Sequence, residues 1–352
     1  MSIGAFVRAA VLEAFGGPEG LVVQSVPDPI PGPGEVLVKV GAVCVNRTDV
    51  HVMERTNIGR NVVLPHIGGL DPAGVVVAHG PDVSEPALGT RVVARPMIPC
   101  LECRFCRSGA ESVCERPSYI GVHRAGGFAE LVALPARAVF PIPDGLDDEG
   151  ATVAAHSVPV ALHLLDAVGG VGPGDRVLVL GAAGGLGLAA VQIAHHLGAW
   201  VIGAVADPSK LDGLDGGPDA VVDYADPPSL PGQVRALTDG HGVTVVVDNV
   251  GSAELWPHAV ASLDKGGRIL TCGAHAGGLV TLDISAFYRL QLRLLATAGT
   301  TGEEFRRALD LVANGVVRPV RHGTWALEEI RAAFREMLAR HNIGKIVVRV
   351  AP

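Results

Sequence analysis

Four cysteines stand close together in a Cys-x2-Cys-x2-Cys-x7-Cys pattern: Cys100, Cys103, Cys106 and Cys114. Thiolates at this spacing suit one tetrahedral zinc ion with Zn–S bonds of about 2.3 Å. An ion held on all four corners has no open position for a substrate, so the pattern predicts a structural metal that shapes a lobe. The only other cysteines in the chain are Cys44 and Cys272.

Two other uses of these cysteines stay open at this point. A pair of disulfides would suit a small secreted protein, but this chain has 352 residues and no stretch that reads as a signal peptide. An iron–sulfur cluster also uses Cys-x2-Cys-x2-Cys, although ferredoxins have a shorter step to the fourth cysteine and a proline after it. One structural zinc ion per chain is therefore the prediction.

Length and composition indicate an ordinary globular protein of about two domains. Hydrophobic residues make up 48% of the chain and charged residues 18%, and the net charge is −8. An acidic balance without basic runs gives no footprint for nucleic acid or for an anionic membrane. The longest uncharged stretch, residues 177–194, is interrupted by glycines, so we expect no membrane span there and a cytoplasmic protein.

The pattern of residues divides the chain into a β-rich part and an alternating part. Short β-branched runs at 36–40, 74–78 and 91–94 predict strands, and the proline-rich residues 27–34 predict a rigid connector. From about Ala161 strand-like and helix-like segments alternate, which predicts a parallel sheet with right-handed crossovers. The expected strands are 177–180, 200–204, 220–223, 243–248 and 268–272. Helices are expected at 186–197, 253–263, 303–314 and 327–340, and a last strand at 346–350.

A glycine-rich turn joins the first strand of the alternating part to its helix. The turn contains Ala182, Gly184, Gly185, Leu186 and Gly187. Glycines there permit a tight turn and let backbone N–H groups reach a pyrophosphate at the helix N-terminus. Glycines that serve packing alone are the alternative, but the strand–turn–helix setting within a run of βα units favours a dinucleotide site.

The end of the next strand bears on which dinucleotide is bound. NAD sites usually place a carboxylate at this strand tip, where it binds the ribose 2′-hydroxyl and would repel a 2′-phosphate. The tip here is Val205, and Asp207 lies two residues beyond it. Lys210 follows and could pair with a phosphate, although a solvated surface lysine is the alternative. We therefore expect NADP(H).

Several segments together resemble the medium-chain dehydrogenase/reductase superfamily over essentially the whole chain. They are residues 32–40 (Gly-Pro-Gly-Glu-Val-Leu-Val-Lys-Val), the four-cysteine segment, 126–130 (Gly-Gly-Phe-Ala-Glu), the glycine loop, 248–251 (Asp-Asn-Val-Gly) and 344–347 (Gly-Lys-Ile-Val). The resemblance implies an α/β protein with a GroES-like β-rich catalytic domain at 1–158, whose zinc lobe lies at about 96–116. A Rossmann domain with a doubly wound parallel sheet would follow at 159–291, and residues 292–352 would return to the catalytic domain.

The glycine loop is similar to that of the quinone oxidoreductase branch, because Ala182 replaces the first glycine of the alcohol dehydrogenases. In that branch the lysine and tyrosine that match Lys210 and Tyr224 contact the 2′-phosphate. The resemblance therefore strengthens the expectation of NADP(H), and it adds Asn249 to the residues expected to bind the dinucleotide.

The resemblance also implies that a catalytic zinc is missing. In zinc alcohol dehydrogenases its ligands match Asn46, Leu70 and a position near Ala155, with His156 beside it. Leucine cannot bind zinc and a neutral amide is a poor ligand for it. The alternative is a rearranged metal site made from Cys44, His66, Asp71 and His156.

Without that metal, hydrogen-bond donors must stabilise the negative oxygen that hydride transfer creates. The resemblance assigns Thr48 and His51 to a proton relay, Arg47 to the pyrophosphate and Asn46 to the nicotinamide pocket. Donors of this kind suit a conjugated acceptor, whose charge spreads into an enolate, better than an unactivated alcohol. We therefore expect an NADPH-dependent reductase of activated C=C or C=O bonds in enones, quinones or related carbonyls.

Two other functions stay open, and the substrate is not identified. One is an alcohol dehydrogenase with an altered metal site, and the other is a catalytically silent nucleotide-binding protein. Relatives take their substrate-pocket residues from loops that match 58–66, 118–123 and 287–295. They commonly pair through the edge of the Rossmann sheet, here expected near residues 267–273, which suggests a homodimer.

Overall fold

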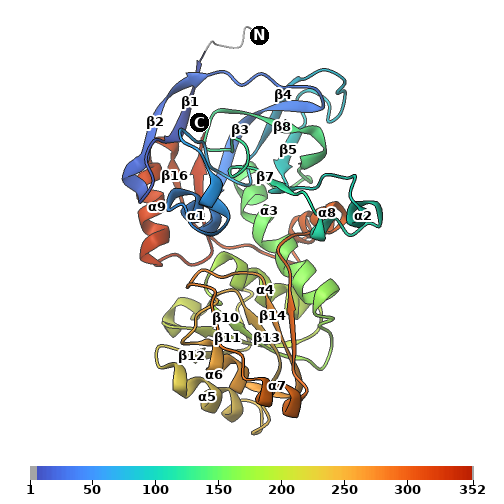
Figure 1. Cartoon of the computed structure of the whole chain (residues 1–352), viewed down its shortest axis with the longest axis vertical. Helices are drawn as coiled ribbons and strands as arrows, with labels where there is room; N and C mark the ends of the chain where they lie inside the picture. Colours follow the sequence, from blue (N-terminus) through green and yellow to red (C-terminus); the bar gives the residue numbers. More distant parts are fainter. Residues whose placement is uncertain (1–5, 351–352) are drawn as a thin grey trace. The chain divides into compact units, whose positions relative to one another are not determined.

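The computed structural model describes residues 6–350, and these form two compact units (Figure 1). The first unit contains the chain as far as His156, then Thr301–Ala313 and the segment from Val320 onward. The second contains Ser157–Thr300 and Asn314–Pro319, so the chain passes between the units four times. The domain limits expected from the sequence, 1–158, 159–291 and 292–352, stay predictions.

A seven-stranded sheet forms the first unit, in the order β16-β17-β3-β4-β5-β9 with β8 added to β3. Its strands are β3 (Glu35–Val45), β4 (Ala73–His79), β5 (Arg91–Ala94), β8 (Leu131–Pro135), β9 (Val139–Pro141), β16 (Arg321–Ala326) and β17 (Lys345–Arg349). Two small sheets accompany it, β1 (Phe6–Leu12) with β2 (Leu21–Pro27), and β6 (Met97–Ile98) with β7 (Ser118–Tyr119).

Strand β3 is the centre of this unit. It is buried along most of its length because β4, β8 and β17 all pair with it. Its alternating valines join the main core cluster, where Phe128 packs edge-on against Phe334 with ring centroids 5.8 Å apart. The predicted strands at 36–40, 74–78 and 91–94 are confirmed, and the connector at 27–34 separates β2 from β3.

Helices of the first unit are short and flank the sheet. They are α1 (Arg47–Met53), α2 (Arg104–Arg107), α8 (Gly302–Ala313) and α9 (Ile330–Ala339), with 3-10 turns η1 (Pro18–Gly20), η2 (Asn57–Asn61), η3 (Glu111–Val113), η4 (Ala136–Ala138) and η8 (Leu327–Glu329). The amphipathic helix expected at 303–314 is α8, and the one at 327–340 divides into η8 and α9.

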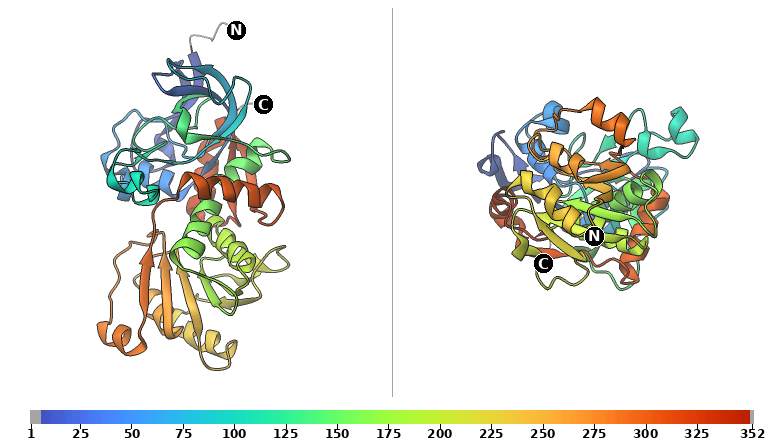
Figure 2. Two further views of the ribbon diagram at one scale, coloured as in Figure 1. Left: turned by 90° about the vertical axis from the view of Figure 1, so that its right-hand side faces the viewer. Right: turned by 90° about the horizontal axis from the view of Figure 1, so that it is seen from below.

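Six parallel strands form the sheet of the second unit, in the order β12-β11-β10-β13-β14-β15. They are β10 (Arg176–Leu180), β11 (Trp200–Val205), β12 (Ala220–Asp223), β13 (Val243–Asp248), β14 (Leu263–Thr271) and β15 (Arg293–Ala296). Helices α4 (Gly185–His196), α5 (Leu230–Ala236) and α6 (Trp256–Ala261) pack on these strands (Figure 2). The strand order reverses between β10 and β13, which is the doubly wound Rossmann arrangement expected from the sequence. The remaining elements are η6 (Pro208–Leu211), η7 (Pro227–Ser229) and α7 (Ile284–Leu290).

Two expectations about the second unit are corrected by the structure, one in the length of a helix and one in the position of a sheet edge. The helix expected at 253–263 is only α6, because β14 already begins at Leu263 and pairs there with Val243. The sheet edge expected near 267–273 is not an edge, because β15 pairs with β14 from Arg268 to Thr271. The edge strand on this side is β15.

One helix is long and apolar enough to cross a membrane by composition alone. It consists of α3 (Asp148–Leu162) and the π-helical turn η5 (His163–Val168). The apolar window of this helix is 72% buried inside the protein. Among residues 6–350 this is the one such segment, and its burial is typical of the core helix of a soluble protein.

Candidate functional site

The glycines of the turn after β10 have different structural roles. Gly181 has a φ of +67°, a left-handed conformation that favours glycine. A Cβ on Gly187 would lie 2.2 Å from the carbonyl oxygen of Gly181, so helix α4 packs directly on the turn. A Cβ on Gly184, the N-cap of α4, would meet nothing nearer than 3.5 Å. Gly187 therefore serves packing, while Gly184 leaves the helix N-terminus open to a ligand.

Asn249 lies beside this turn, at the point where the strand order reverses. It follows β13, which pairs with β10, and its Oδ1 would lie 3.1 Å from a Cβ on Gly181. Asp248 holds the turn after β13, because its Oδ1 accepts the N–H groups of Val250 and Gly251 at 2.8 and 3.0 Å. The structure thus brings the glycine turn and Asn249 together at the carboxyl ends of adjacent strands, where dinucleotides bind in such sheets.

The tip of β11 carries the residues expected to select the dinucleotide. Asp207 caps η6, since its Oδ1 accepts from the backbone and hydroxyl of Ser209 at 3.2 and 2.6 Å. Lys210 lies in η6, and the Tyr224 N–H donates to the carbonyl of Val205 at 3.0 Å. Lys210 and Tyr224 therefore both lie next to the end of β11, and their contact with a 2′-phosphate stays a prediction.

The four cysteines converge in a lobe of the first unit. Their sulfur atoms all lie within 4.8 Å of one another, with Cys100 Sγ 3.9 Å from Cys106 Sγ and 3.5 Å from Cys114 Sγ. Four bonds of 2.3 Å to a tetrahedral ion would separate the sulfurs by about 3.8 Å, so the geometry fits zinc. Within residues 6–350 no other three or more His, Cys, Asp or Glu side chains meet in this way.

Backbone N–H groups surround these sulfurs as they do in metal lobes. The N–H of Cys100 donates to Cys114 Sγ at 3.3 Å, and that of Cys103 donates to Cys100 Sγ at 3.4 Å. Such donors, the backbone of Glu102 first, lower the pKa of the Cys100 thiol to about 6. They favour the thiolate of Cys100, the form that binds a metal ion, whereas desolvation raises the pKa of the Cys106 thiol to about 12.

Asn46 lies in a buried polar cluster between β3 and α1. Its Nδ2 donates to Asp71 Oδ2 at 3.0 Å and to the carbonyl of Cys44 at 3.3 Å, and its Oδ1 accepts from Lys345 Nζ. Lys345 Nζ also lies 3.8 Å from Asp71 Oδ2. Both hydrogens of the Asn46 amide are thus committed inside the protein, so Asn46 positions its neighbours rather than offering a donor.

Sequence reasoning missed Lys345 and Asp71 as members of this cluster. Lys345 begins strand β17, and Ile346 of that strand pairs with Val45 at the end of β3. The Lys345 side chain is only 7% exposed and that of Asp71 is fully buried. A lysine followed by three apolar residues at the start of this strand was the available signal, and it marks a buried charge that needs a partner.

Burial shifts the pKa values of the titratable groups in and around this cluster. Burial, reinforced by the charge of Lys345, lowers the pKa of His156 to about 3, so its imidazole is neutral at physiological pH. Burial raises the pKa of the Cys44 thiol to about 12 and that of Asp49 to about 7. Burial also raises the pKa of Asp71, and the charge of Lys345 opposes this shift, as do the N–H of Cys44 at 2.9 Å and the hydroxyl of Thr152 at 3.3 Å.

Helix α1 presents the remaining predicted residues of the first unit. Arg47, Thr48 and His51 are all partly exposed, and Thr48 and His51 are three residues apart on one face. His51 Nδ1 lies 3.0 Å from Thr56 Oγ1, and burial lowers the pKa of its imidazole. Burial and the neighbouring positive charge of Arg340 also lower the pKa of Arg47. An anionic group bound nearby would offset the repulsion between these two like charges.

A cavity of about 310 Å³ lies in the first unit between residues 58–66 and 122–125. Both segments overlap loops that we expected to line the substrate pocket. His66 donates from Nε2 to the carbonyl of Gly121 at 2.9 Å, which leaves Nδ1 of the neutral ring as an acceptor. His123 Nδ1 accepts the N–H of Tyr119 at 3.0 Å, which leaves Nε2–H as a donor.

Comparisons with known proteins agree with this architecture. The family model of the alcohol dehydrogenase GroES-like domain matches residues 32–144, and that of the zinc-binding dehydrogenases matches 185–314. A NAD-dependent alcohol dehydrogenase of Sulfolobus acidocaldarius is 30% identical over 98% of this chain and 100% of that protein. An acryloyl-coenzyme A reductase of Sulfurisphaera tokodaii is 27% identical over 95% of this chain and 98% of its own length. A crystal structure of an NAD-dependent alcohol dehydrogenase matches with a TM-score of 0.90 and 35% identity, over 98% and 100% of the two chains.

The chain belongs to the medium-chain dehydrogenase/reductase superfamily. It is therefore an oxidoreductase, and its GroES-like and Rossmann units are those expected from the sequence. The rearranged metal site considered above is not assembled among residues 6–350, because Cys44, His66, Asp71 and His156 do not form such a group. Leu70 is 1% exposed and apolar, so it offers no ligand at a position where zinc alcohol dehydrogenases of the superfamily have one.

Proposed function

We propose that this chain is an NADPH-dependent reductase of an activated C=C or C=O bond that works without a catalytic metal. The observation that carries the proposal is the buried cluster of Asn46, Asp71 and Lys345, which joins an amide, a carboxylate and an ammonium group. By the resemblance, Asn46 matches one zinc ligand, and Asp71 follows Leu70, which matches another. A fixed ammonium gives positive charge without an open coordination position, which suits a delocalised enolate better than an alkoxide. The similarity to an acryloyl-coenzyme A reductase supports an alkene conjugated to a carbonyl as the acceptor.

A bound reduced dinucleotide would supply the hydride. The residues of the first unit then have two tasks, to stabilise the oxygen on which charge develops and to return a proton. Thr48 offers a hydroxyl donor, and His51, on the same face of α1, can exchange protons with solvent. Lys345 supplies positive charge from within the protein, and Asn46 and Asp71 hold its ammonium in place.

Substitution of Thr48 tests this assignment. We expect Thr48→Ala to lower kcat with an enone or enoyl thioester about 100-fold, because a positioned acid–base group contributes roughly that factor. The Kd for NADPH should stay within about twofold, and Thr48→Ser should restore most of the rate. Unchanged kcat in Thr48→Ala would remove Thr48 from the mechanism.

Metal analysis with a substrate panel separates this function from its alternative. The named relatives support an NAD-dependent alcohol dehydrogenase as the second candidate. The proposal expects one zinc ion per chain, in the cysteine lobe, and consumption of NADPH with enones, quinones or enoyl thioesters. Two zinc ions per chain together with NAD+-dependent alcohol oxidation would establish the alternative.

We propose NADP(H) as the dinucleotide because Lys210 and Tyr224 lie beside the tip of β11, while the carboxylate of Asp207 caps η6. Removing Lys210 should cost one charge-assisted hydrogen bond to the 2′-phosphate, about 1.5–3 kcal/mol. Lys210→Ala should therefore weaken NADPH binding about tenfold or more in a fluorescence titration and leave NADH binding unchanged. Equal losses of affinity for NADPH and NADH would contradict the assignment. The matched control is Lys265→Ala, which removes an exposed lysine elsewhere in this unit.

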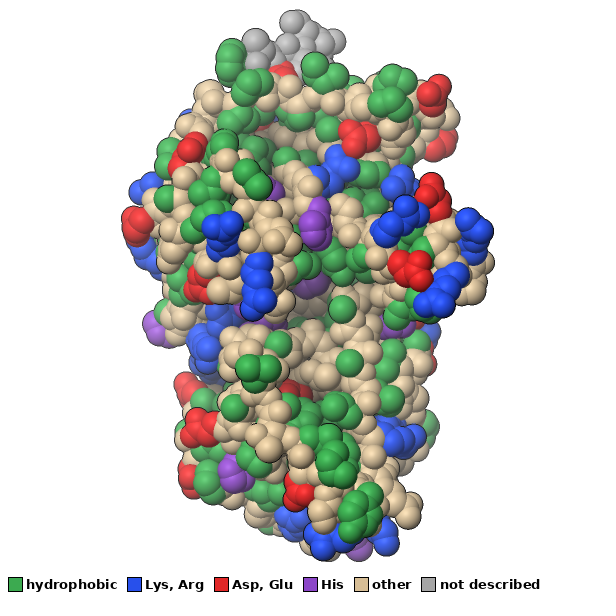
Figure 3. Space-filling model, in the orientation of Figure 1, with side chains coloured by type: hydrophobic (Ala, Val, Ile, Leu, Met, Phe, Trp, Pro, Cys, Tyr) green, Lys and Arg blue, Asp and Glu red, His purple; other side chains and the backbone are tan. Residues whose placement is uncertain are grey.

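We also propose a soluble, cytoplasmic homodimer that pairs through β15. Figure 3 shows apolar side chains on the surface over α7, and Leu279, Ile284 and Tyr288 are 86%, 64% and 68% exposed. Leu294 of the edge strand is 46% exposed. An edge strand beside exposed apolar side chains is suited to pairing with a second copy.

A further inference from the structure

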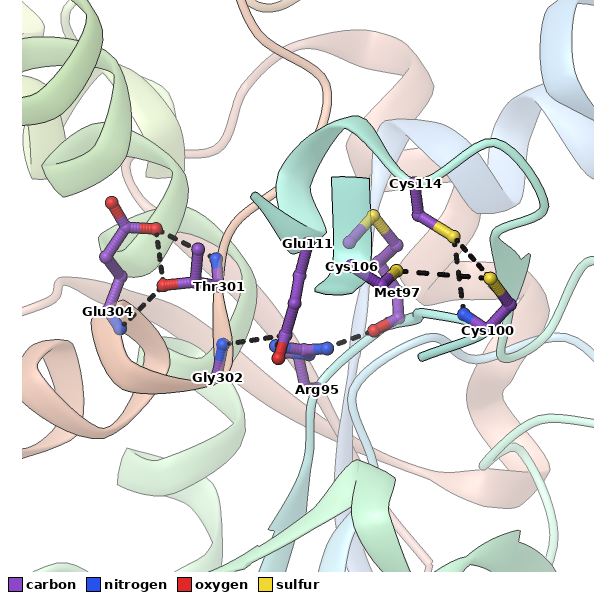
Figure 4. Close-up of polar contacts among 9 residues, drawn as sticks. All are labelled: Arg95, Met97, Cys100, Cys106, Glu111, Cys114, Thr301, Gly302 and Glu304. Atoms are coloured by element: carbon purple, nitrogen blue, oxygen red, sulfur yellow. Dashed lines mark hydrogen bonds and ion pairs between the residues drawn. The ribbon is translucent and has the colours of Figure 1, made fainter. Parts of the chain in front are cut away.

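Glu111 joins the cysteine lobe to the start of helix α8 (Figure 4). Its Oε2 accepts from Arg95 Nη1 at 2.6 Å and from the N–H of Gly302 at 3.1 Å. The Arg95 side chain is 3% exposed and that of Glu111 is 24% exposed, so this contact is largely removed from water. A charge-assisted contact of this kind is stronger than one between exposed side chains.

Glu111 and Arg95 both form hydrogen bonds with the backbone of the segment that carries the cysteines. Glu111 is the first residue of η3, and its backbone carbonyl accepts the N–H of Cys114 at 3.0 Å. Arg95 Nε donates to the carbonyl of Met97 at 3.0 Å, in the strand that leads to Cys100. An ion bound by Cys100 and Cys114 would therefore hold both supports of the Glu111 carboxylate.

On the other side, the contact reaches the first turn of α8. Thr301 caps this helix, with its hydroxyl accepting from the N–H of Glu304 at 3.2 Å. The first N–H groups of a helix have no partner within it, and a carboxylate beside them is favourable. Thr301 is also the residue at which the chain enters the first unit after leaving the second at Thr300.

We infer that metal bound in the cysteine lobe orders the first turn of α8 through Glu111, at a point where the chain returns from the dinucleotide-binding unit. Glu111 is a positioning residue in this arrangement and no metal ligand. Loss of the ion releases η3 and the Arg95–Glu111 pair, and the first turn of α8 then frays. The inference depends on the metal of the lobe and is independent of which bond the enzyme reduces.

Hydrogen exchange measured by mass spectrometry tests the inference on the full chain. In the zinc-loaded protein the amides of residues 302–306 should be protected, and removing zinc with a chelator should speed their exchange about tenfold or more. Glu111→Ala should show the fast exchange with zinc still bound at one ion per chain, measured by a colorimetric release assay. Glu111→Gln keeps an acceptor for the N–H of Gly302. Its exchange rate at residues 302–306 should lie between those of the zinc-loaded original chain and Glu111→Ala.

Glu115→Gln is the matched control, since Glu115 follows Cys114 but pairs with the exposed Arg104 at 2.9 Å. The amides of residues 302–306 in this variant should exchange at the rates of the original chain, both with zinc and without it. Unchanged exchange at 302–306 after zinc removal would overturn the inference, and so would protection of this segment in zinc-loaded Glu111→Ala. If Glu111→Ala does not fold, Glu111→Gln is compared with the original chain instead. Equal exchange at residues 302–306 in these two zinc-loaded proteins would then overturn the inference.

Discussion

Lys345→Met is expected to lower the free energy of unfolding by about 3–5 kcal/mol, because it removes one partner of a buried ion pair. Asp71 is fully buried and Lys345 Nζ lies 3.8 Å from its Oδ2, so the variant leaves a carboxylate without its compensating cation. Asn46 Oδ1 loses its Lys345 partner in the same variant. Urea denaturation followed by circular dichroism measures the effect.

A double variant separates stability from function. Lys345→Met/Asp71→Asn removes both charges and should recover most of the lost stability, since a neutral pair of similar size carries no unpaired charge. Under the proposed function it should still reduce enones or enoyl thioesters far more slowly than the original chain, while its Kd for NADPH is unchanged. Lys39→Met, which alters an exposed lysine of β3, is the control and should change neither quantity. A double variant with full activity would show that Lys345 only balances Asp71.

Gly187→Ala is expected to destabilise the second unit by about 3 kcal/mol or more. The new Cβ would lie 2.2 Å from the carbonyl oxygen of Gly181 and 2.8 Å from the Cα of Ala182. Both obstacles are backbone atoms, so relief requires moving α4 away from the turn. Calorimetry should show a lower unfolding temperature even without dinucleotide.

Gly184→Ala gives the contrasting result in the same turn. Its Cβ would meet nothing nearer than 3.5 Å, so the fold should keep its stability within about 0.5 kcal/mol. The methyl group would face the N-terminus of α4, where the pyrophosphate is expected, so NADPH binding should weaken at least tenfold. Equal stability losses in Gly184→Ala and Gly187→Ala would contradict the division of roles.

Features set by neighbouring residues were predictable from the sequence. The spacing of the cysteines already places four sulfurs within reach of one ion, and the structure brings them within 4.8 Å. Likewise the run from β10 through the glycine turn into α4 is continuous in the chain, and its hydrophobic periodicity marks both elements. Errors arose where strand limits depend on partners, as when β14 begins at Leu263 because Val243 pairs with it.

Contacts between distant segments were decided only by tertiary structure. Lys345 and Asn46 are 299 residues apart, and Glu111 and Gly302 are 191 apart. No local pattern encodes which lysine will meet which amide, because strand pairing of β17 with β3 creates that contact. The order of residues in the chain thus determined the family, the glycine turn and the cysteine lobe. The contacts of Lys345 with Asn46 and Asp71 came instead from the packing of remote strands against each other.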